Sequence, residues 1–208
     1  MLYLLDWIVA ILTCMYAVLL LAYRFWYGKM RVFQLSQLDQ IEQVRPKQAP
    51  TQFTVIIPAR NEAANIKACV DSILAQDYPM DAFEIIVIDD FSEDDTAFIV
   101  NALHAQYPQV RLLQLADHCK EGETLAYKKK AIEIAVSVAK GDWIVTTDAD
   151  CKVPPRWLFL YNAYIQQHQP AFVAAPVMFI KTAGILNQFQ LLDFLALQGI
   201  TAAAVGAG

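Results

Sequence analysis

The sequence has few glycines and none of the glycine-rich loops that bind phosphate groups. Its 208 residues include seven glycines, and neither GxGxxG nor GxxxxGK[ST] occurs. Phosphate-cradling loops need backbone amides that no side chain obstructs. The sequence therefore argues against a dinucleotide-binding dehydrogenase and against a P-loop NTPase.

Cysteine, histidine and basic residues are also sparse or scattered. The four cysteines form no CxxC pair, so neither a zinc site nor a disulfide framework is expected. The three histidines are isolated, and no Ser-His-Asp or Cys-His arrangement can be argued from them. The net charge is −5, without a basic stripe that alternates with aromatic residues. We therefore expect no nucleic acid among the partners.

Hydrophobic residues make up 57% of the chain and are concentrated at its two ends. The segment from Leu2 to Tyr23 carries one charge, Asp6, and at about 1.5 Å per residue it covers the roughly 30 Å hydrocarbon core of a bilayer. This predicts a transmembrane helix over residues 1–27. A buried core helix is the alternative.

The basic residues near this segment follow it, which argues against a cleavable signal peptide; they are Arg24, Lys29 and Arg31. The positive-inside rule then places the N-terminus outside and the rest of the chain in the cytoplasm. We expect a single-pass protein of the cytoplasmic (inner) membrane.

The remainder alternates between strand and helix patterns after a membrane-proximal linker at residues 28–50. Strands are predicted at 53–57, 83–88, 110–115, 143–147 and 171–180, and helices at 62–75, 94–106, 124–139 and 155–167. Continuous apolar strands between amphipathic helices indicate an α/β fold with a mostly parallel sheet covered on both faces. The predicted domain covers residues 51–182.

Residues 183–208 are again apolar, and a helix is predicted over 184–204. This helix either lies in the membrane interface or packs against the sheet, and both alternatives stay open. The sequence ends in Ala-Val-Gly-Ala-Gly, without a charged helix end or a polar tail. We therefore expect that the chain is a truncated piece of a longer protein.

Polar clusters follow three of the predicted strands, at residues 58–62, 89–95 and 148–150. In an open parallel sheet the ligand site lies beyond the carboxyl ends of the strands. Since each cluster follows directly on an apolar run, we expect all three to gather at the same edge of the sheet.

The third cluster contains two carboxylates, Asp148 and Asp150, two residues apart. Side chains at i and i+2 of an extended segment project to the same side, so the two carboxylates can converge. Such a pair suits a hard cation, Mg²⁺ or Mn²⁺, and a cation held this way usually holds phosphates as well. The hypothesis is a metal-assisted site for a phosphorylated donor.

The other polar residues allow both structural and functional interpretations. Ser92 with Asp95 fits a helix N-cap, and Glu93 and Asp94 suit the positive end of the helix dipole. Asp89 and Asp90 end a buried strand, where two carboxylates cost stability, so at least one of them is expected to contact ligand.

Two basic features also stay open. Arg60 beside Asn61 and Glu62 either counters a phosphate or starts a helix. Lys128, Lys129 and Lys130 form either a solvated helix face or a route by which one lysine reaches the anionic donor.

Three elements of the chain together resemble the family 2 glycosyltransferases, whose fold is called GT-A. They are Thr54-Val-Ile-Ile-Pro-Ala-Arg-Asn-Glu-Ala, then Glu84-Ile-Ile-Val-Ile-Asp-Asp-Phe-Ser-Glu-Asp-Asp-Thr, then Lys128 to Ile132 leading through Ala139-Lys-Gly-Asp to Thr147-Asp-Ala-Asp. The resemblance covers about residues 53–160 and rests on the order and spacing of the elements.

The resemblance implies a role for each matching residue. The base and ribose of a nucleotide-sugar donor would be held by Pro58, Ala59, Arg60, Glu62 and Asp90. Asp148 and Asp150 would form the metal and diphosphate site, with Asp150 the more direct metal ligand. Lys128 matches the lysine of the family, although Tyr127 stands where the family has glycine.

The implied reaction is an inverting transfer of a sugar from a nucleotide sugar, a UDP-sugar by family frequency, to a lipid or glycan acceptor. The general base would be an Asp in a later acidic motif. Nothing after residue 180 matches that motif, so we expect the base beyond Gly208. Two other functions stay open: a nucleotidyltransferase, and a non-catalytic relative that binds nucleotide or scaffolds a membrane complex.

Overall fold

The structure of the chain is a computed structural model that describes residues 2–29, 49–119, 127–179 and 184–207. The chain divides into two compact units. One unit covers Leu38–Gln169 and contains the sheet, and the other joins Met1–Gln37 to Pro170–Gly208. Most of the predicted linker at residues 28–50 lies outside the described residues, and the predicted domain limits stay a prediction.

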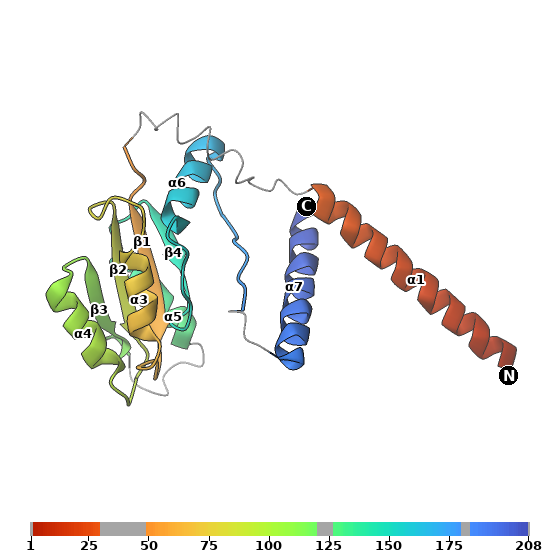
Figure 1. Cartoon of the computed structure of the whole chain (residues 1–208), viewed down its shortest axis with the longest axis horizontal. Coiled ribbons are helices and arrows are strands. Elements are labelled where there is room, and N and C mark those ends of the chain that lie inside the picture. The colour runs from red at the N-terminus through yellow and green to blue at the C-terminus, as the bar shows by residue number, and fades with distance from the viewer. Residues whose placement is uncertain (1, 30–48, 120–126, 180–183, 208) are drawn as a thin grey trace. The chain divides into compact units, whose positions relative to one another are not determined.

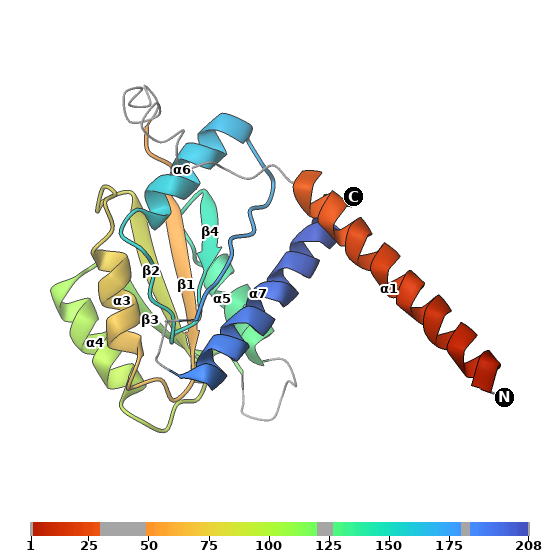
Figure 2. The ribbon, with the colours of Figure 1, turned by 45° about the vertical axis from the view of Figure 1, so that its right-hand side comes forward.

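The sheet unit is built on four parallel strands in the order β3-β2-β1-β4. The strands are β1 (Phe53–Ala59), β2 (Phe83–Asp89), β3 (Val110–Gln114) and β4 (Trp143–Thr146). Parallel neighbours need crossover connections, and the helices α3 (Ile66–Leu74) and α4 (Thr96–Gln106) supply those from β1 to β2 and from β2 to β3. Along the chain, the helix α5 (Tyr127–Ser137) lies between β3 and β4, the two outer strands. A short 3₁₀ helix, η2 (Leu115–Asp117), follows β3, and α6 (Trp157–His168) follows β4. Figure 2 shows β1 between β2 and β4.

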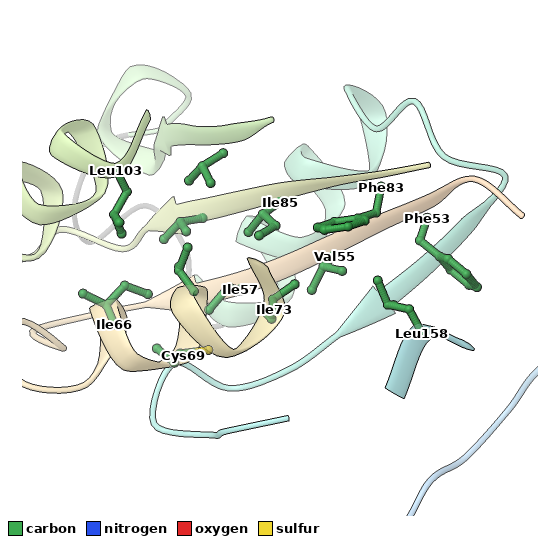
Figure 3. Packing of buried hydrophobic residues seen from close by; sticks show 14 of the residues in the cluster. Phe53, Val55, Ile57, Ile66, Cys69, Ile73, Phe83, Ile85, Leu103 and Leu158 are labelled. Atoms are coloured by element: carbon green, nitrogen blue, oxygen red, sulfur yellow. The ribbon is translucent and has the colours of Figure 1, made fainter. Parts of the chain in front are cut away.

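Helices cover both faces of the sheet. Alternate residues of a strand point to opposite faces, so neighbouring residues are buried in different clusters. Val55 and Ile57 of β1 pack with α3, α4 and α6, whereas Ile56 packs with α5. Figure 1 shows α3 and α4 on one face of the sheet, and Figure 3 shows Ile66, Cys69 and Ile73 of α3 in one cluster with Val55 and Ile57 of β1. The continuous apolar strands of the sequence thus follow from burial on two faces.

Polar side chains join the strands at the edge of the sheet where the strands begin, which we call the amino edge. Oε1 of Glu84 accepts hydrogen bonds from Oγ1 of Thr54 (2.9 Å) and from the backbone nitrogen of Lys140 (2.7 Å), and Oε2 faces Arg111 at 3.3 Å. The backbone nitrogen of Gly141 donates to Oγ1 of Thr54 at 2.9 Å. A Cβ atom on Gly141 would lie 2.5 Å from the backbone of β1, so this position requires glycine.

The second unit contains the two long apolar helices, α1 (Leu2–Lys29) and α7 (Ile185–Gly206), which contact each other. Both are long and apolar enough to cross a membrane, by length and composition alone. The side chain of Gln198 in α7 accepts from the backbone nitrogen of Val177 at 3.1 Å and donates to its carbonyl oxygen. The rings of Phe179 and Phe194 lie 4.6 Å apart.

The prediction of a strand at residues 171–180 is wrong for the residues that the structure describes. Residues 171–179 pair with no strand, and most of their side chains are exposed. Pro176 has no backbone N–H for a ladder, and Gln198 takes both polar backbone groups of Val177. The predicted helix start at Thr124 lies outside the described residues, and α5 is seen from Tyr127.

Candidate functional site

The three polar loops that follow β1, β2 and β4 share one edge of the sheet, as the sequence predicts. The strands are parallel and adjacent, with Ala59 in register with Asp89 and Ile56 in register with Thr146. Their carboxyl ends therefore point the same way. We call this edge, with the loops at residues 58–62, 89–95 and 147–150, the carboxyl edge.

The loops after β1 and β2 are tied together by Asn61. Its backbone nitrogen donates to Oγ of Ser92 at 2.9 Å, and its side-chain oxygen accepts from the backbone nitrogen of Glu93 at 2.8 Å. Asn61 and Phe91 both have positive φ, at 55° and 54°. Such backbone conformations in non-glycine residues cost energy and gather at functional sites.

The prediction that Ser92 caps the following helix is wrong. The N-cap residue of α4 is Asp95, which makes no side-chain capping hydrogen bond. Ser92 is taken by Asn61, and Asp94 joins the loops through Ala63, whose backbone nitrogen donates to Oδ2 at 3.0 Å. The hydrogen bond from the Thr96 hydroxyl lowers the pKa of Asp94. These side chains are structural and connect the two loops, and Oδ1 of Asp94 also accepts from the backbone nitrogen of Thr96, the first residue of α4, at 2.9 Å.

Asp148 and Asp150 lie just beyond the end of β4, and both are exposed to solvent. Nζ of Lys128, near the start of α5, lies 2.6 Å from Oδ1 of Asp148. Lys130 faces Glu133 instead, at 3.4 Å. Of these two lysines the structure thus brings Lys128 to Asp148.

Three residues of α3 and its C-terminal end, which the sequence does not reveal as functional, hold the chain around Asp148 and Asp150. Sγ of Cys69 donates to the carbonyl oxygen of Asp148 at 3.6 Å, and Oγ of Ser72 accepts from the backbone nitrogen of Val153 at 3.1 Å. Gln76 is buried; it donates to the carbonyl oxygen of Pro154 at 2.7 Å and accepts from the backbone nitrogen of Leu158 at 3.0 Å. These contacts join residues about eighty positions apart, and no local pattern signals them.

The thiol of Cys69 stays protonated at neutral pH. Burial raises its pKa to about 12, and the negative charges of neighbouring groups add to this. Burial also raises the pKa of Cys151, whose Sγ lies 3.7 Å from Oδ1 of Asp150. The two thiols are therefore weak hydrogen-bond donors here and not nucleophiles.

The residues predicted for the base and ribose lie around the end of β1 and β2. Pro58 and Ala59 are the last residues of β1, Arg60 is exposed directly after them, and Glu62 is half-buried. Asp90 is half-buried, and its backbone nitrogen donates to the carbonyl oxygen of Ala59 at 2.8 Å. Their roles stay a prediction.

Asp89 ends β2 and is 6% exposed. Its Oδ2 accepts from the backbone nitrogen of Ser92 at 3.4 Å, and Oδ1 has no hydrogen-bond partner among the described residues. A buried carboxylate oxygen without a partner is uncommon and calls for an explanation. This oxygen lies at the carboxyl edge, beside Asp90.

The donor set at Asp148 and Asp150 fits a divalent cation whose other ligands come from substrate and water. The described residues contain no group of three or more His, Cys, Asp or Glu side chains that could enclose a metal. Mg²⁺ keeps several waters and is bound through one or two carboxylates plus substrate phosphates.

Residues 54–194 match the profile described as Glycosyl transferase family 2. The chain belongs to this family. The match includes the carboxyl edge with all three of its polar loops, and it favours glycosyl transfer over nucleotidyl transfer.

Curated relatives of the chain are glycosyltransferases. The chain is 32% identical over 103 residues to the beta-monoglucosyldiacylglycerol synthase of Synechocystis, which is 50% of this chain and 20% of that protein. It is 31% identical over 157 residues to an N-acetylglucosaminyltransferase of Rhizobium meliloti, which is 73% of this chain and 34% of that protein. The chain thus spans between about a fifth and a third of the length of these relatives.

A solved structure with the same fold is a mannosyltransferase of Pyrobaculum calidifontis in complex with GDP-Man and Mn²⁺. It matches with a TM-score of 0.51 and 28% identity, over 75% of this chain and 43% of that chain. The GT-A-like fold with a mostly parallel sheet is thus confirmed, and a member of the fold binds a nucleotide sugar together with a divalent metal.

Proposed function

We propose that this chain contains the donor-binding half of an inverting glycosyltransferase that uses a nucleotide sugar, with UDP as the expected nucleotide. One observation carries the proposal: Asp148 and Asp150 follow β4 at the carboxyl edge of the sheet, and Nζ of Lys128 lies 2.6 Å from Oδ1 of Asp148. A carboxylate pair with an ammonium group beside it suits a diphosphate and its metal.

The donor would lie along the carboxyl edge. The base and ribose would rest on Pro58, Ala59, Arg60, Glu62 and Asp90, where Asn61 holds the first two loops together. Asp148 and Asp150 would hold Mg²⁺ or Mn²⁺, which neutralises charge on the diphosphate. The mannosyltransferase bound to GDP-Man and Mn²⁺ supports this arrangement.

The reaction would be an in-line displacement at the anomeric carbon of the sugar. The bond from this carbon to the diphosphate oxygen breaks as a bond to the acceptor oxygen forms, and the acceptor proton passes to a general base. Asp193 is the one acidic residue after residue 180 in this sequence, and it lies exposed within the apolar helix α7. We therefore expect the 208-residue chain to bind donor weakly and to transfer no sugar on its own.

The acceptor would be a lipid or a glycan, used at the cytoplasmic face of the inner membrane. The apolar surface of α1, with side chains such as Trp7 and Met15 exposed by 68% and 64%, supports a membrane anchor. The Synechocystis relative is named for the synthesis of a glycolipid. The interfacial position of α7 remains part of this proposal.

Calorimetry with UDP and with GDP, in the presence and absence of Mn²⁺, tests the proposal on the full chain in detergent micelles. Wild type should bind UDP in a metal-dependent manner, and Asp150→Ala should weaken this binding by roughly tenfold or more, because the metal loses its more direct ligand. Binding of neither nucleotide by wild type would leave only the scaffold interpretation.

The matched control is Asp142→Ala. Asp142 is an exposed carboxylate directly before β4, so the change removes the same charge at the opposite end of the same strand. It should leave UDP binding unchanged. Equal losses in the two variants would show that net charge, and not the site, governs binding.

A further inference from the structure

The inference concerns the ion pair between Lys128 and Asp148 and rests on the proposed function of the same edge. We propose that Lys128 is a counter-cation that occupies Asp148 until the divalent metal and the donor arrive. Nζ of Lys128 lies 2.6 Å from Oδ1 of Asp148, one of the two carboxylates proposed to hold the metal. The ammonium group and the metal therefore compete for one carboxylate.

The position of Lys128 follows from the way α5 packs. Ala131 and Ala135, three and seven residues further on, are fully buried against the sheet. Residues at these spacings share one face of a helix, and helical side chains tilt toward the N-terminus. Lys128 thus continues the buried face of α5 beyond the sheet, toward the carboxyl edge.

A second contact fixes the start of this helix. The ring of Tyr127 meets the ring of Phe91 edge-on, with centroids 5.8 Å apart. Phe91 directly follows Asp90, so the aromatic pair joins the loop after β2 to the residue before Lys128. The residue that stands in place of the family's glycine therefore helps to place the lysine.

The pair is strong enough to bias the site but weak enough to open. The side chains of Lys128 and Asp148 are 65% and 60% exposed. Exposed ion pairs contribute about 0.2 to 1 kcal/mol, which corresponds to roughly a 1.4- to 5-fold change in an equilibrium constant. Opening the pair would release the carboxylate to the metal and the ammonium group to the diphosphate.

This exchange gives Lys128 opposite effects on two ligands. Without nucleotide, the lysine opposes metal binding, because it neutralises Asp148 and repels a second cation. With nucleotide bound, it favours binding, because it lies near the anionic diphosphate. A lysine that contacts only the diphosphate would not oppose metal binding in this way.

The test compares Mn²⁺ binding by wild type and Lys128→Met, measured by electron paramagnetic resonance on the full chain in detergent micelles without nucleotide. The variant should bind Mn²⁺ about two- to fivefold more tightly. The difference should shrink as salt is raised from 0.05 to 0.5 M, because exposed ion pairs are screened. UDP binding at saturating Mn²⁺ should become weaker in the same variant.

Lys130→Met is the matched control. It removes the same charge two residues further along α5, where the ammonium group of Lys130 faces Glu133 and not Asp148. Lys130→Met should change the affinities for Mn²⁺ and for UDP less than Lys128→Met does. Unchanged or weaker Mn²⁺ binding by Lys128→Met overturns the inference. An equal gain in Mn²⁺ affinity in Lys130→Met also overturns it, and so does the absence of Mn²⁺ binding by both wild type and Lys128→Met.

Measuring Mn²⁺ binding and nucleotide binding separately distinguishes a failure of this inference from a failure of the proposed function. Wild type that binds Mn²⁺ but no nucleotide contradicts the proposed function, while tighter Mn²⁺ binding by Lys128→Met still supports the counter-cation. Metal-dependent UDP binding, together with equal Mn²⁺ affinity of wild type and Lys128→Met, supports the proposed function and contradicts the counter-cation. Circular dichroism of both variants confirms that the exposed substitutions leave the fold intact.

Discussion

Glu84 at the amino edge of the sheet and the pair Asp148 and Asp150 at the carboxyl edge lie in opposite environments. At the amino edge, Glu84 is mostly buried and its oxygens are taken by Thr54, Lys140 and Arg111. At the carboxyl edge, Asp148 and Asp150 are exposed, and Oδ1 of Asp89 has no hydrogen-bond partner in the part of the chain that the structure describes. The partners of Glu84 all come from the protein and stabilise the fold, whereas Asp148 and Asp150 are exposed to solvent, where a ligand can reach them.

The largest expected effect lies at the amino edge. Gly141→Ala places a methyl group 2.5 Å from the backbone of β1, which cannot yield as a flexible side chain would. We expect the free energy of unfolding to fall by about 3 kcal/mol, at the upper end of the usual cost of overpacking. Urea unfolding followed by circular dichroism measures this.

The control for this change is Gly199→Ala, where a Cβ atom meets nothing within 4 Å. It should leave the unfolding transition of the sheet in place. A Gly141→Ala protein as stable as wild type would show that the amino edge is looser than its contacts indicate.

A smaller loss of stability is expected for Gln76→Leu. The side chain of Gln76, just after α3, makes hydrogen bonds to the chain that follows Asp148 and Asp150, so this change tests whether that contact supports the carboxyl edge. The change leaves the backbone groups of Pro154 and Leu158 without their side-chain partner. Buried unsatisfied groups cost about 1 to 3 kcal/mol, so we expect a loss of about 2 kcal/mol in unfolding free energy, together with weaker UDP binding.

Gln106→Leu makes the same replacement at an exposed position of α4 and should change neither quantity. Chemical unfolding and calorimetry on the two variants measure stability and affinity separately. A Gln76→Leu protein with lower stability but normal UDP affinity would show that α3 does not position Asp148 and Asp150.

The smallest effect concerns the thiol of Cys69. The unfolded chain releases this proton above the ordinary pKa of 9.0, whereas the folded chain keeps it until about 12, so stability falls as pH rises between these values. At pH 10 this loss is about 1 kcal/mol and is absent in Cys69→Ala. The stability difference between wild type and the variant should therefore narrow between pH 8 and pH 10, and a constant difference would contradict the assigned pKa.

Much of the sheet unit can be predicted from the sequence because its strands are buried on both faces. Segments such as Phe53–Ala59 and Phe83–Asp89 read as continuous apolar runs, and polar clusters mark the ends of β1, β2 and β4. Parallel pairing then brings these clusters to one edge. The position of Asp148 and Asp150 after β4, at the same edge of the sheet as the loop after β1, follows from this parallel pairing.

What the sequence does not predict depends on partners far away in the chain. Residues 171–179 are apolar like a strand, but a strand also needs a neighbouring strand, and Gln198 takes the backbone groups of Val177 instead. Ser92 resembles a helix cap, but Asn61 takes its hydroxyl group. Nothing in the local sequence marks Cys69 and Gln76, because their hydrogen-bond partners, Asp148 and Pro154, are about eighty residues away.

The most direct test measures UDP affinity and stability together for Asp150→Ala and Glu84→Gln. Asp150→Ala should lose UDP binding by roughly tenfold or more, while its unfolding free energy stays within about 0.5 kcal/mol of wild type, as is usual for exposed sites. Glu84→Gln should lose about 2 kcal/mol of stability and keep the UDP affinity of wild type. The account would be contradicted if Glu84→Gln weakened UDP binding as much as Asp150→Ala, or if Asp150→Ala destabilised the fold and left the affinity unchanged.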